Sequence, residues 1–594
     1  MALDIAGVGT APLAAATRWL EAFNAAAEKG DAAALAALFL PEGHWRDVLA
    51  FTWDIETMNG RSAIKARFAE TLPKIKPGKL TLAAGRTPPR EVTRAAMPCV
   101  EALIEFETSI GLCSGAIRLV EDPDGTPDMK AWIVMTTLDE IRGYEEKIER
   151  RRPGGEAFSR DFGGDNWLDL REKSQAYEAH DPTVLVIGAG QAGLSVAARL
   201  KMLEIDTLVI DRHERIGDNW RKRYHSLVLH NEVYVNHLPY MPFPPNCPVY
   251  IPKDKLASWF EAYAEALELN VWTGTELTTG SYDDAAGCWN VTLRKADGTE
   301  RTMRPRHVVF ATGVSAIPVI PKLPGLDTFA GTLMHSGSYT EGRAWKGRTA
   351  IVLGTGNSAH DVAQDLEASG ANVTMVQRSS TYIVSLSEAQ KVYAMYDEGP
   401  PFEDCDVLAM ATPFLFLVRA YKLSTAEMYK ADKPLLDRLE KVGFKLDMGG
   451  EGETGFQMKY LQQGGGYYFN VGCSDLIADG KIKLMHYDQI ERFVPEGVLL
   501  KDGTIAPADL IVAATGYKNQ QDVVRAHFGD EIADRMGPVW GFGEDGELRN
   551  MWRRTPQPRI WFNGGALAQC RIYSKVMALQ IKAIEEGIIP AEKP

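Results

Sequence analysis

Two glycine-rich turns are the residues of this sequence most clearly arranged for chemistry. The first carries Gly188, Gly190 and Gly193 directly after the apolar run Val184–Ile187. In such a turn the first glycine permits a sharp bend, the second lets the backbone approach a pyrophosphate, and the third lets the helix pack closely on the strand. The N-terminus of the helix attracts the phosphates through its free N–H groups and its dipole. The pattern predicts a dinucleotide-binding unit; a glycine-rich turn without a ligand is the alternative.

The same arrangement occurs again later in the chain. Gly354 and Gly356 follow the apolar run Thr349–Leu353, and Asn357 and Ser358 begin the next helix-like stretch. A second dinucleotide unit is expected here, with its phosphates again at a helix N-terminus.

The residues that follow the next strand differ between the two units. Thr207–Ile210 ends in Asp211, whereas Asn372–Val376 is followed by Arg378 and Ser379. A carboxylate accepts hydrogen bonds from a bare ribose, while a planar guanidinium grips a 2′-phosphate through two hydrogen bonds. We therefore predict a different dinucleotide for each unit, with Arg378 setting a preference for the 2′-phosphorylated one. A surface arginine without such a role is the alternative.

Several domains must position these turns, because 594 residues are too many for one hydrophobic core. Strands alternating with helices around both turns predict an α/β fold with two Rossmann-like domains. Helix-like stretches followed by strand-like runs predict an α+β domain before them. The expected segments are an α+β domain at 1–145, a linker at 146–180, the first dinucleotide domain at 181–345, the second with a helical insertion at 346–487, and the return of the first at 488–594.

The N-terminal domain has a recognisable pattern of its own. WLEAFNAAAEKGDAAALAALF leading into HWRDVLAFTWD resembles the cone-shaped nuclear-transport-factor-2-like (SnoaL-like) fold. Some proteins of that fold use a His–Asp pair in chemistry, and His44 with Asp47 or Asp54 fits such a pair. We favour the other interpretation, in which Trp45, Trp53 and their neighbours fill the cone or form a contact surface. The domain is expected to support dimerisation or to wall off the mouth of a channel.

Composition excludes several classes of protein. The formal charge of −14 argues against a nucleic-acid partner. Seven scattered cysteines without a C-x-x-C motif argue against a disulfide framework and a metal site, and fit a reducing cytoplasm. The N-terminus lacks the basic start and apolar segment of a secretory signal. The longest apolar run, Leu408–Val418, is too short to span a bilayer. We expect a cytoplasmic homodimer with no transmembrane segment.

Motifs spread over about Thr183–Ile588 resemble the flavin-containing monooxygenase family (class B flavoprotein monooxygenases), and within it the YUCCA-type and bacterial type II branches. The run Phe329–Tyr339 fits the fingerprint F-x-G-x-x-x-H-S-x-x-Y at every fixed position. The other matching residues lie in a G-x-x-W-R motif, two A-T-G motifs and a final glycine turn: Gly217, Trp220, Arg221, Thr312, Thr515, Gly516 and Gly565.

The resemblance implies FAD in the first unit and NADPH in the second, and such enzymes often accept NADH as well. In this family reduced flavin and O₂ form a peroxide at flavin carbon 4a, which transfers one oxygen atom to a small organic substrate. Disulfide reductases share the two nucleotide folds but need a redox cysteine pair, and Cys247 and Cys288 lack such spacing. Electrons are therefore expected to pass to oxygen.

Three residues are candidates for catalysis through this resemblance. His230, followed by Asn231, corresponds to the asparagine that animal-type enzymes place beside the flavin, and the YUCCA and type II branches also have histidine there. A histidine can donate a hydrogen bond to the oxygenated flavin. His335 of the fingerprint is the third candidate, either as a catalytic base or as a structural, hydrogen-bonded histidine.

The substrate stays open at this point. The end of the fingerprint, Tyr339-Thr340, differs from the tryptophan and proline or aspartate of Baeyer–Villiger enzymes. This favours S- or N-oxygenation with some Baeyer–Villiger oxidation of ketones. Oxidative decarboxylation of a 2-oxo acid, as in YUCCA enzymes, is an alternative. A flavin redox sensor or NADPH oxidase without an oxygenated product is another.

Overall fold

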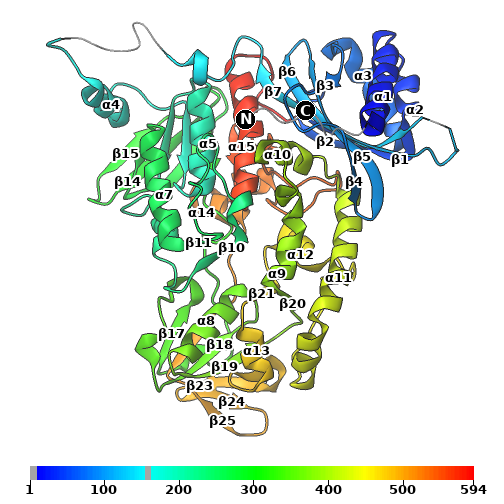
Figure 1. The fold of residues 1–594 in the computed structure, drawn as a ribbon. Helices are drawn as coiled ribbons and strands as arrows, with labels where there is room; N and C mark the ends of the chain where they lie inside the picture. The colour runs from blue at the N-terminus through cyan, green and yellow to red at the C-terminus, as the bar shows by residue number, and fades with distance from the viewer. Residues whose placement is uncertain (1–9, 127, 154–161, 594) are drawn as a thin grey trace.

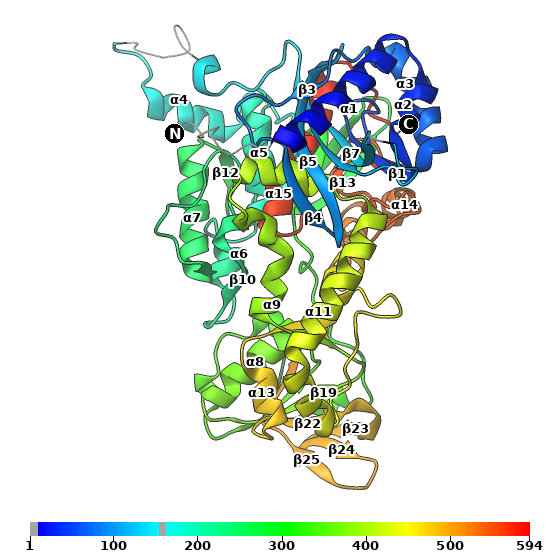
Figure 2. The same ribbon diagram turned by 45° about the vertical axis from the view of Figure 1, so that its right-hand side comes forward.

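The computed structural model describes residues 10–126, 128–153 and 162–593, and the figures show the chain from two sides (Figures 1 and 2). The predicted absence of a secretory signal rests partly on residues 1–9, and part of the predicted linker falls on 154–161. Both stretches lie outside the described residues. Among those that are described, no single helix is long and apolar enough to cross a bilayer. Two consecutive helices, α10 (Phe402–Met410) and α11 (Phe414–Lys441), pass that test as a pair but are bent by 109° between them.

The N-terminal domain is an α+β unit. Its sheet runs β2-β1-β7-β6-β5-β3, with β4 also paired to β5, and only the β1–β7 pair is parallel. Buried aromatic side chains fill the space between sheet and helices: Trp45 stacks on Phe68 at 4.1 Å between ring centroids. The elements are α1 (Thr10–Glu28), α2 (Ala32–Ala37), β1 (Phe39–Val48), β2 (Ile55–Asn59), α3 (Gly60–Ile75), β3 (Thr81–Leu82), β4 (Arg90–Arg94), β5 (Met97–Glu107), β6 (Gly111–Val120) and β7 (Lys130–Ile141).

The first Rossmann-like domain is built on a parallel sheet in the order β12-β9-β8-β16-β27. Its strands are short and mostly buried, because helices cover both faces of such a sheet. The elements are α4 (Trp167–Ala176), β8 (Val184–Ile187), α5 (Gln191–Met202), β9 (Thr207–Ile210), α6 (Asp218–Arg221), β10 (Val228–Glu232), β11 (Tyr250–Pro252), α7 (Lys253–Ala266), β12 (Asn270–Trp272), β13 (Thr275–Asp283), β14 (Cys288–Lys295), β15 (Glu300–Met303), β16 (His307–Phe310), α14 (Gln520–Met536), β27 (Ile560–Phe562) and α15 (Leu567–Glu585).

The second Rossmann-like domain has the parallel order β17-β26-β18-β19-β22. The predicted α/β class with two dinucleotide-type sheets is therefore confirmed. The elements are β17 (Thr332–His335), β18 (Thr349–Leu353), α8 (Asn357–Ala368), β19 (Asn372–Gln377), α13 (Cys473–Ala478), β22 (Lys483–His486), β23 (Ile490–Val494), β24 (Gly497–Leu500), β25 (Ile505–Pro507) and β26 (Leu510–Ala513).

Two domain boundaries differ from the sequence expectation. β17 was placed in the first domain and β26 in its return, yet both pair within the second sheet, with β26 between β17 and β18. The sequence of a short apolar strand that is buried on both faces does not indicate which sheet the strand joins. The first domain resumes in its sheet only at β27.

A helical insertion joins the two Rossmann-like domains to the N-terminal domain (Figure 1). It consists of β20 (Tyr382–Ser385), α9 (Leu386–Gln390), α10 (Phe402–Met410), α11 (Phe414–Lys441), α12 (Gly455–Gln463) and β21 (Tyr467–Asn470). Figures 1 and 2 both place α10 beneath the N-terminal sheet, and α11 runs from there toward the second sheet.

Candidate functional site

The turn after β8 requires glycine at two positions. Gly188 has φ 109°, and a Cβ there would lie 2.6 Å from the carbonyl oxygen of Ala311. A Cβ on Gly193 would lie 1.8 Å from the carbonyl oxygen of Gly188, because α5 packs directly on the end of β8. Both positions have the predicted role of allowing a sharp bend and close packing.

The second turn has the same geometry. Gly354 has φ 120°, and a Cβ there would lie 2.6 Å from the carbonyl oxygen of Ala514. The residues after Ala514 continue this edge: Thr515 Oγ1 donates to the Val319 carbonyl at 2.5 Å, and Gly516 has φ 83°. The second A-T-G motif thus faces the second glycine turn, as the first A-T-G motif faces the first.

Both helices that follow the turns begin without a side-chain cap. Gly190 and Gly356 are the N-cap residues of α5 and α8, so the first N–H groups of each helix are left for a ligand. A Cβ on Gly190 would meet Asn219 Nδ2 at 2.8 Å, and the nearest atom to a Cβ on Gly356 is 3.8 Å away. Within the described chain, Asn219 Oδ1 and Thr312 Oγ1 are buried without a hydrogen-bond partner. The free N–H groups of the two helices fit a dinucleotide pyrophosphate at each turn, and the unpartnered Thr312 hydroxyl adds a further donor at the first.

Asp211 stands at the end of β9, as predicted, but it also stabilises the glycine turn. Its Oδ2 accepts from the backbone N–H of Ala189 at 2.8 Å, and its Oδ1 accepts from the backbone N–H and ring of His213 at 2.9 and 2.8 Å. Burial raises the pKa of this carboxyl, but the hydrogen bonds from His213 and Ala189 lower it more, so the net pKa falls. The carboxylate therefore stays ionised beside the turn.

Side chains not singled out from the sequence hold the edges of this first site. Trp220 Nε1 donates to Gln191 Oε1 at 3.2 Å, and Gln191 Nε2 reaches the Gly565 carbonyl at 3.5 Å. Gln520 Nε2 donates to the Gly313 carbonyl at 3.2 Å. Gln191 and Asn219 lie inside the recognised motifs, next to Gly190 and Trp220, so their position beside those residues could have indicated them. Nothing in the sequence around Gln520 indicates its role. Arg221 pairs with Asp218 in α6 and donates to the carbonyl of Ile216, a structural arrangement.

At the second site the predicted residues separate into two groups. Asn357 Oδ1 accepts from the backbone N–H of Phe469 at 3.0 Å, so it ties α8 to β21. Ser358 is half-buried in the first turn of α8. Arg378 and Ser379 are exposed after the end of β19, where a 2′-phosphate at the carboxyl edge of the sheet would meet them.

His230 and Asn231 lie on β10, at the junction of the two Rossmann-like domains. His230 Nε2 lies 4.0 Å from Oδ2 of Asp361, which belongs to α8 of the second domain. The hydroxyl of Tyr224 donates to the same carboxylate. Burial raises the pKa of Asp361, although His230, Tyr224 and Arg223 act against that rise. Asn231 Nδ2 donates to the hydroxyl of Tyr393 at 3.5 Å.

The hydrogen bonds of His335 fit a structural histidine better than a catalytic base. Its Nε2 donates to the Gly516 carbonyl at 3.0 Å, and its Nδ1 accepts from the backbone N–H of Gly337 at 3.0 Å. Both ring nitrogens are thus engaged, and burial lowers the pKa of the ring. His335 holds the fingerprint segment against the second A-T-G turn, so the geometry does not favour its assignment as a catalytic residue.

A group of tyrosines that sequence reasoning missed extends from Asn231 toward the N-terminal domain. We call Tyr393, Tyr421, Tyr460, Tyr467 and Tyr573 the tyrosine cluster. They come from the insertion and from α15, and burial raises the pKa of the first four. Tyr460 also fixes the start of α15, because the backbone N–H of Ala566 donates to its hydroxyl at 3.1 Å. Only tertiary folding brings these residues together.

The N-terminal domain offers no free His–Asp pair. His44 Nδ1 bonds Asn59 Oδ1 at 2.8 Å, and Asp54 pairs with Arg553 across the domain boundary. Asp47 accepts hydrogen bonds from the hydroxyl groups of Thr136 and Thr52 at 2.6 and 2.8 Å and from the backbone, while burial raises its pKa to about 6. The aromatic core surrounds these groups, in agreement with the structural interpretation.

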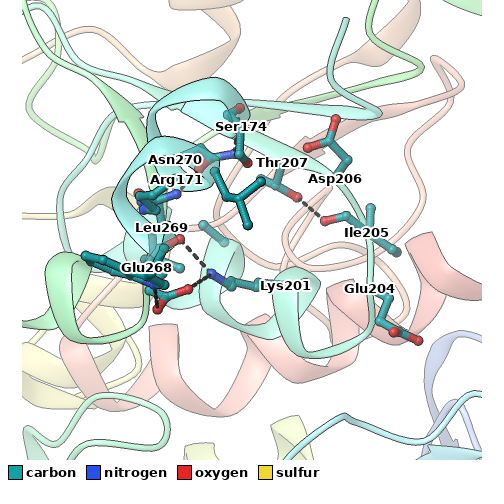
Figure 3. A pocket seen from close by; sticks show the side chains of 13 residues that line it. Arg171, Ser174, Lys201, Glu204, Ile205, Asp206, Thr207, Glu268, Leu269 and Asn270 are labelled. Carbon is teal, nitrogen blue, oxygen red and sulfur yellow. Dashed lines mark hydrogen bonds and ion pairs between the residues drawn. The ribbon is translucent and has the colours of Figure 1, made fainter. Parts of the chain in front are cut away.

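A pocket of about 360 Å³ lies between α4, the end of α5 and β12 (Figure 3). Its polar groups are already paired: Lys201 Nζ donates to the Glu268 carbonyl at 2.7 Å, and Arg171 bonds Asn270. The pocket lies at the amino ends of β9 and β12, whereas dinucleotides bind at the carboxyl ends of parallel strands. It is therefore separate from the candidate site.

All seven cysteines are free thiols, and neither Cys247 nor Cys288 pairs with another cysteine. Among the described residues, no group of three or more His, Cys, Asp or Glu side chains is placed to hold a metal ion.

Comparison with known proteins gives a consistent result. The model of a family described as flavin-binding monooxygenase-like matches residues 181–524. The indole-3-pyruvate monooxygenase YUCCA1 of Oryza sativa subsp. japonica is 30% identical over 361 residues, which cover 59% of this chain and 80% of that protein. An ε-caprolactone-bound cyclohexanone monooxygenase has a TM-score of 0.51 at 18% identity, covering 69% of this chain and 89% of the other. A mutant cyclohexanone monooxygenase from Rhodococcus sp. Phi1 bound to NADP⁺ has a TM-score of 0.50 at 16% identity, covering 69% and 87%.

Proposed function

Because this chain belongs to the flavin-binding monooxygenase-like family, whose model matches more than half of its length, we propose that it inserts one oxygen atom into a small, neutral organic substrate. It is an enzyme that uses FAD and NADPH. Bound FAD and NADPH would supply hydride transfer and the activation of O₂, and the protein would bind, orient and shield these groups. S- or N-oxygenation is the proposed main reaction, with Baeyer–Villiger oxidation of ketones beside it.

The observation that carries this proposal is the matched pair of glycine turns. Gly188 and Gly354 bend in the same way, each against the carbonyl of an A-T-G motif, and each turn opens an uncapped helix. The carboxylate of Asp211 suits the free ribose of FAD, and the exposed guanidinium of Arg378 suits the 2′-phosphate of NADPH.

The residues of β10 are proposed to act at the reacting atoms. His230 and Asn231 stand where the two cofactor domains meet, so their side chains can donate hydrogen bonds to oxygen held there. The surrounding aromatic side chains, including Phe469 at 5.6 Å from the ring of His230, keep water from the junction.

Two buried arginines beside the tyrosine cluster favour a neutral substrate. Arg46 donates to Glu547 and to the Met410 carbonyl, and Arg571 donates to Asp406 and to two backbone carbonyls. Because these donors are taken up within the protein, neither guanidinium is available for a substrate carboxylate. A neutral sulfide, amine or ketone makes no such demand.

Decarboxylation of a 2-oxo acid is the second candidate, because the named rice relative is an indole-3-pyruvate monooxygenase. Arg223 is the cation that would serve it. It lies close enough to His335 and Asp361 to lower the pKa of each. A substrate carboxylate would then have to lie at the domain junction, beside β10.

One experiment separates these functions. The purified holoenzyme is given NADPH with methyl phenyl sulfide, cyclohexanone or phenylpyruvate, and NADPH oxidation, hydrogen peroxide and product are measured. Sulfoxide or lactone formed as peroxide falls supports the proposal. Phenylacetate formed from phenylpyruvate with catalase present supports the second candidate, because catalase removes the free peroxide that decarboxylates 2-oxo acids without an enzyme. Peroxide alone with every probe identifies an oxidase or redox sensor. Protein that neither carries flavin nor takes it up contradicts all three.

We also propose that the enzyme is a cytoplasmic homodimer. The absence of disulfides among the seven cysteines agrees with a cytoplasmic enzyme, and the N-terminal domain is a candidate dimer contact. Sedimentation of the holoenzyme at several concentrations tests the homodimer.

A further inference from the structure

The N-terminal domain is joined to the flavin half of the chain through buried polar contacts. Arg118 of β6 donates to the Leu408 carbonyl at 3.1 Å and to the Ala411 carbonyl at the end of α10. Arg86 and Thr87 bind the carboxylate of Asp404 on the same helix. Figure 1 shows α10 and α15 next to the N-terminal sheet, and both helices contact it. The two parts therefore form one body with a specific geometry.

Arg46 of β1 extends furthest across this boundary. Its Nε and Nη2 donate to the two carboxylate oxygens of Glu547 at 2.8 and 2.7 Å. Its Nη1 donates to the Met410 carbonyl at 2.7 Å and to the hydroxyl of Tyr573 at 3.2 Å. Arg46 is 5% exposed and Glu547 7%, and Thr57 Oγ1 adds a hydrogen bond to Glu547 at 2.9 Å. The guanidinium thus fixes an end of α10 and a side chain of α15 at the same time.

Tyr573 belongs to the tyrosine cluster that begins at Asn231. Its ring stacks on Trp552 with centroids 4.1 Å apart and planes 10° from parallel. Tyr393 and Tyr573 both lie near enough to Tyr421 to raise its pKa, in addition to the larger effect of burial. Tyr393 in turn accepts from Asn231 Nδ2. Hydrogen bonds therefore tie the two ends of the cluster to Asn231 of β10 and to Arg46, and Tyr421 lies between them as an electrostatic neighbour of both Tyr393 and Tyr573.

We propose that the N-terminal domain completes the substrate-side wall of the reaction site, with Arg46 as a positioning residue that fixes Tyr573. The proposal rests on the proposed function, because it assigns the cluster to the substrate. A buried ion pair contributes little net stability, but its fixed, bidentate geometry defines the position of what it binds. The flavin half alone would leave Tyr573 and the end of α10 without these donors.

Two conservative variants test the wall. Tyr573→Phe removes only the hydroxyl and keeps the stack on Trp552, and Arg46→Lys keeps the charge but loses the bidentate contact. Asp54→Asn is the matched control, because it breaks the Arg553 ion pair of the same boundary, away from Tyr573. Each holoenzyme is assayed with methyl phenyl sulfide for KM, kcat and peroxide released per NADPH. Hydrogen exchange of residues 571–577 supplies a readout that is independent of turnover.

We expect both Tyr573→Phe and Arg46→Lys to raise KM and the peroxide fraction by about fivefold to tenfold, the equivalent of a hydrogen bond. The rate of flavin reduction by NADPH should stay at the wild-type value. Exchange at 571–577 should rise in Arg46→Lys and not in Asp54→Asn. Wild-type KM and exchange in both variants would overturn the proposal, as would equal changes in Asp54→Asn, which would indicate general loosening. If the wild type itself forms no product, the proposed function fails, and exchange alone decides the role of Arg46.

Discussion

A Cβ on Gly354 would lie 2.6 Å from the carbonyl oxygen of Ala514. A Cβ on Gly188 would lie at the same distance from the carbonyl oxygen of Ala311. The two nucleotide sites are therefore built by the same contact between a glycine turn and an A-T-G motif. This duplicated geometry also assigns the second A-T-G motif to the second Rossmann-like domain, which we propose binds NADPH.

The second turn can be tested with a pair of alanine variants. Gly354→Ala places a methyl group against backbone at a positive φ, so we expect the second domain to lose about 2 kcal/mol or more of stability. Gly356→Ala meets no atom closer than 3.8 Å and should fold normally. It should nevertheless weaken NADPH binding by at least about tenfold, because the methyl group occupies the path of the pyrophosphate. Melting temperature and titration with NADP⁺ check both; normal NADP⁺ affinity in Gly356→Ala would contradict the site.

Arg378 should determine the choice between NADPH and NADH. A hydrogen-bonded guanidinium–phosphate contact contributes about 1.5–3 kcal/mol, so Arg378→Ala should raise KM for NADPH by roughly 10- to 100-fold. KM for NADH should remain unchanged, because NADH has no 2′-phosphate. Arg343→Ala is the control, since this arginine is exposed outside the sheet edge. Equal losses with both cofactors would show that Arg378 supports the fold and not the phosphate.

His230→Ala should increase the release of hydrogen peroxide more than it slows flavin reduction. The reason is that the side chain lies at the domain junction, where it can donate a hydrogen bond to oxygen, while hydride transfer needs only the two cofactors in contact. Stopped-flow reduction under nitrogen and peroxide measured in air separate the two steps. His225→Ala, an exposed neighbour in the same segment, should behave as the wild type. Unchanged peroxide release in His230→Ala would remove the residue from the oxygen reaction.

Local patterns predicted the two dinucleotide turns. The backbone geometry of each turn requires glycine at Gly188, Gly193 and Gly354, and the strand and helix that create this requirement are adjacent in the sequence. The same reasoning could not assign β26 to a sheet, since Leu510–Ala513 is apolar throughout and any buried position suits it. The tyrosine cluster was also beyond prediction. Tyr393 and Tyr573 are separated along the chain by the rest of the insertion, by β22–β26 and by α14, and each is unremarkable in its own segment. Asn219 was missed although it is adjacent to Trp220, because the G-x-x-W-R motif specifies the tryptophan and leaves position 219 open.

The acid stability of the N-terminal domain should depend on Glu101 of β5. Burial by itself raises the pKa of this carboxyl, but Arg118 and Arg94 outweigh burial and lower the pKa from 4.5 to about 2. A carboxylate whose pKa falls on folding stabilises the protein above its unfolded pKa and loses that effect as the pH drops toward the folded pKa. Its contribution, about 3 kcal/mol, should therefore be complete above pH 4.5 and disappear between pH 4.5 and 2.

Glu101→Gln tests this dependence, because it leaves the guanidinium of Arg118 buried, at 1% exposure, without its counter-charge. We expect a loss of about 3–5 kcal/mol at pH 7, with the gap to the wild type shrinking by more than half at pH 3. Glu107→Gln, on the same strand but in an exposed pair with Arg142, should cost less than about 1 kcal/mol at either pH. Denaturant unfolding followed by tryptophan fluorescence measures both variants. A gap for Glu101→Gln that stays constant down to pH 3 would mean that this carboxylate is not the group that titrates.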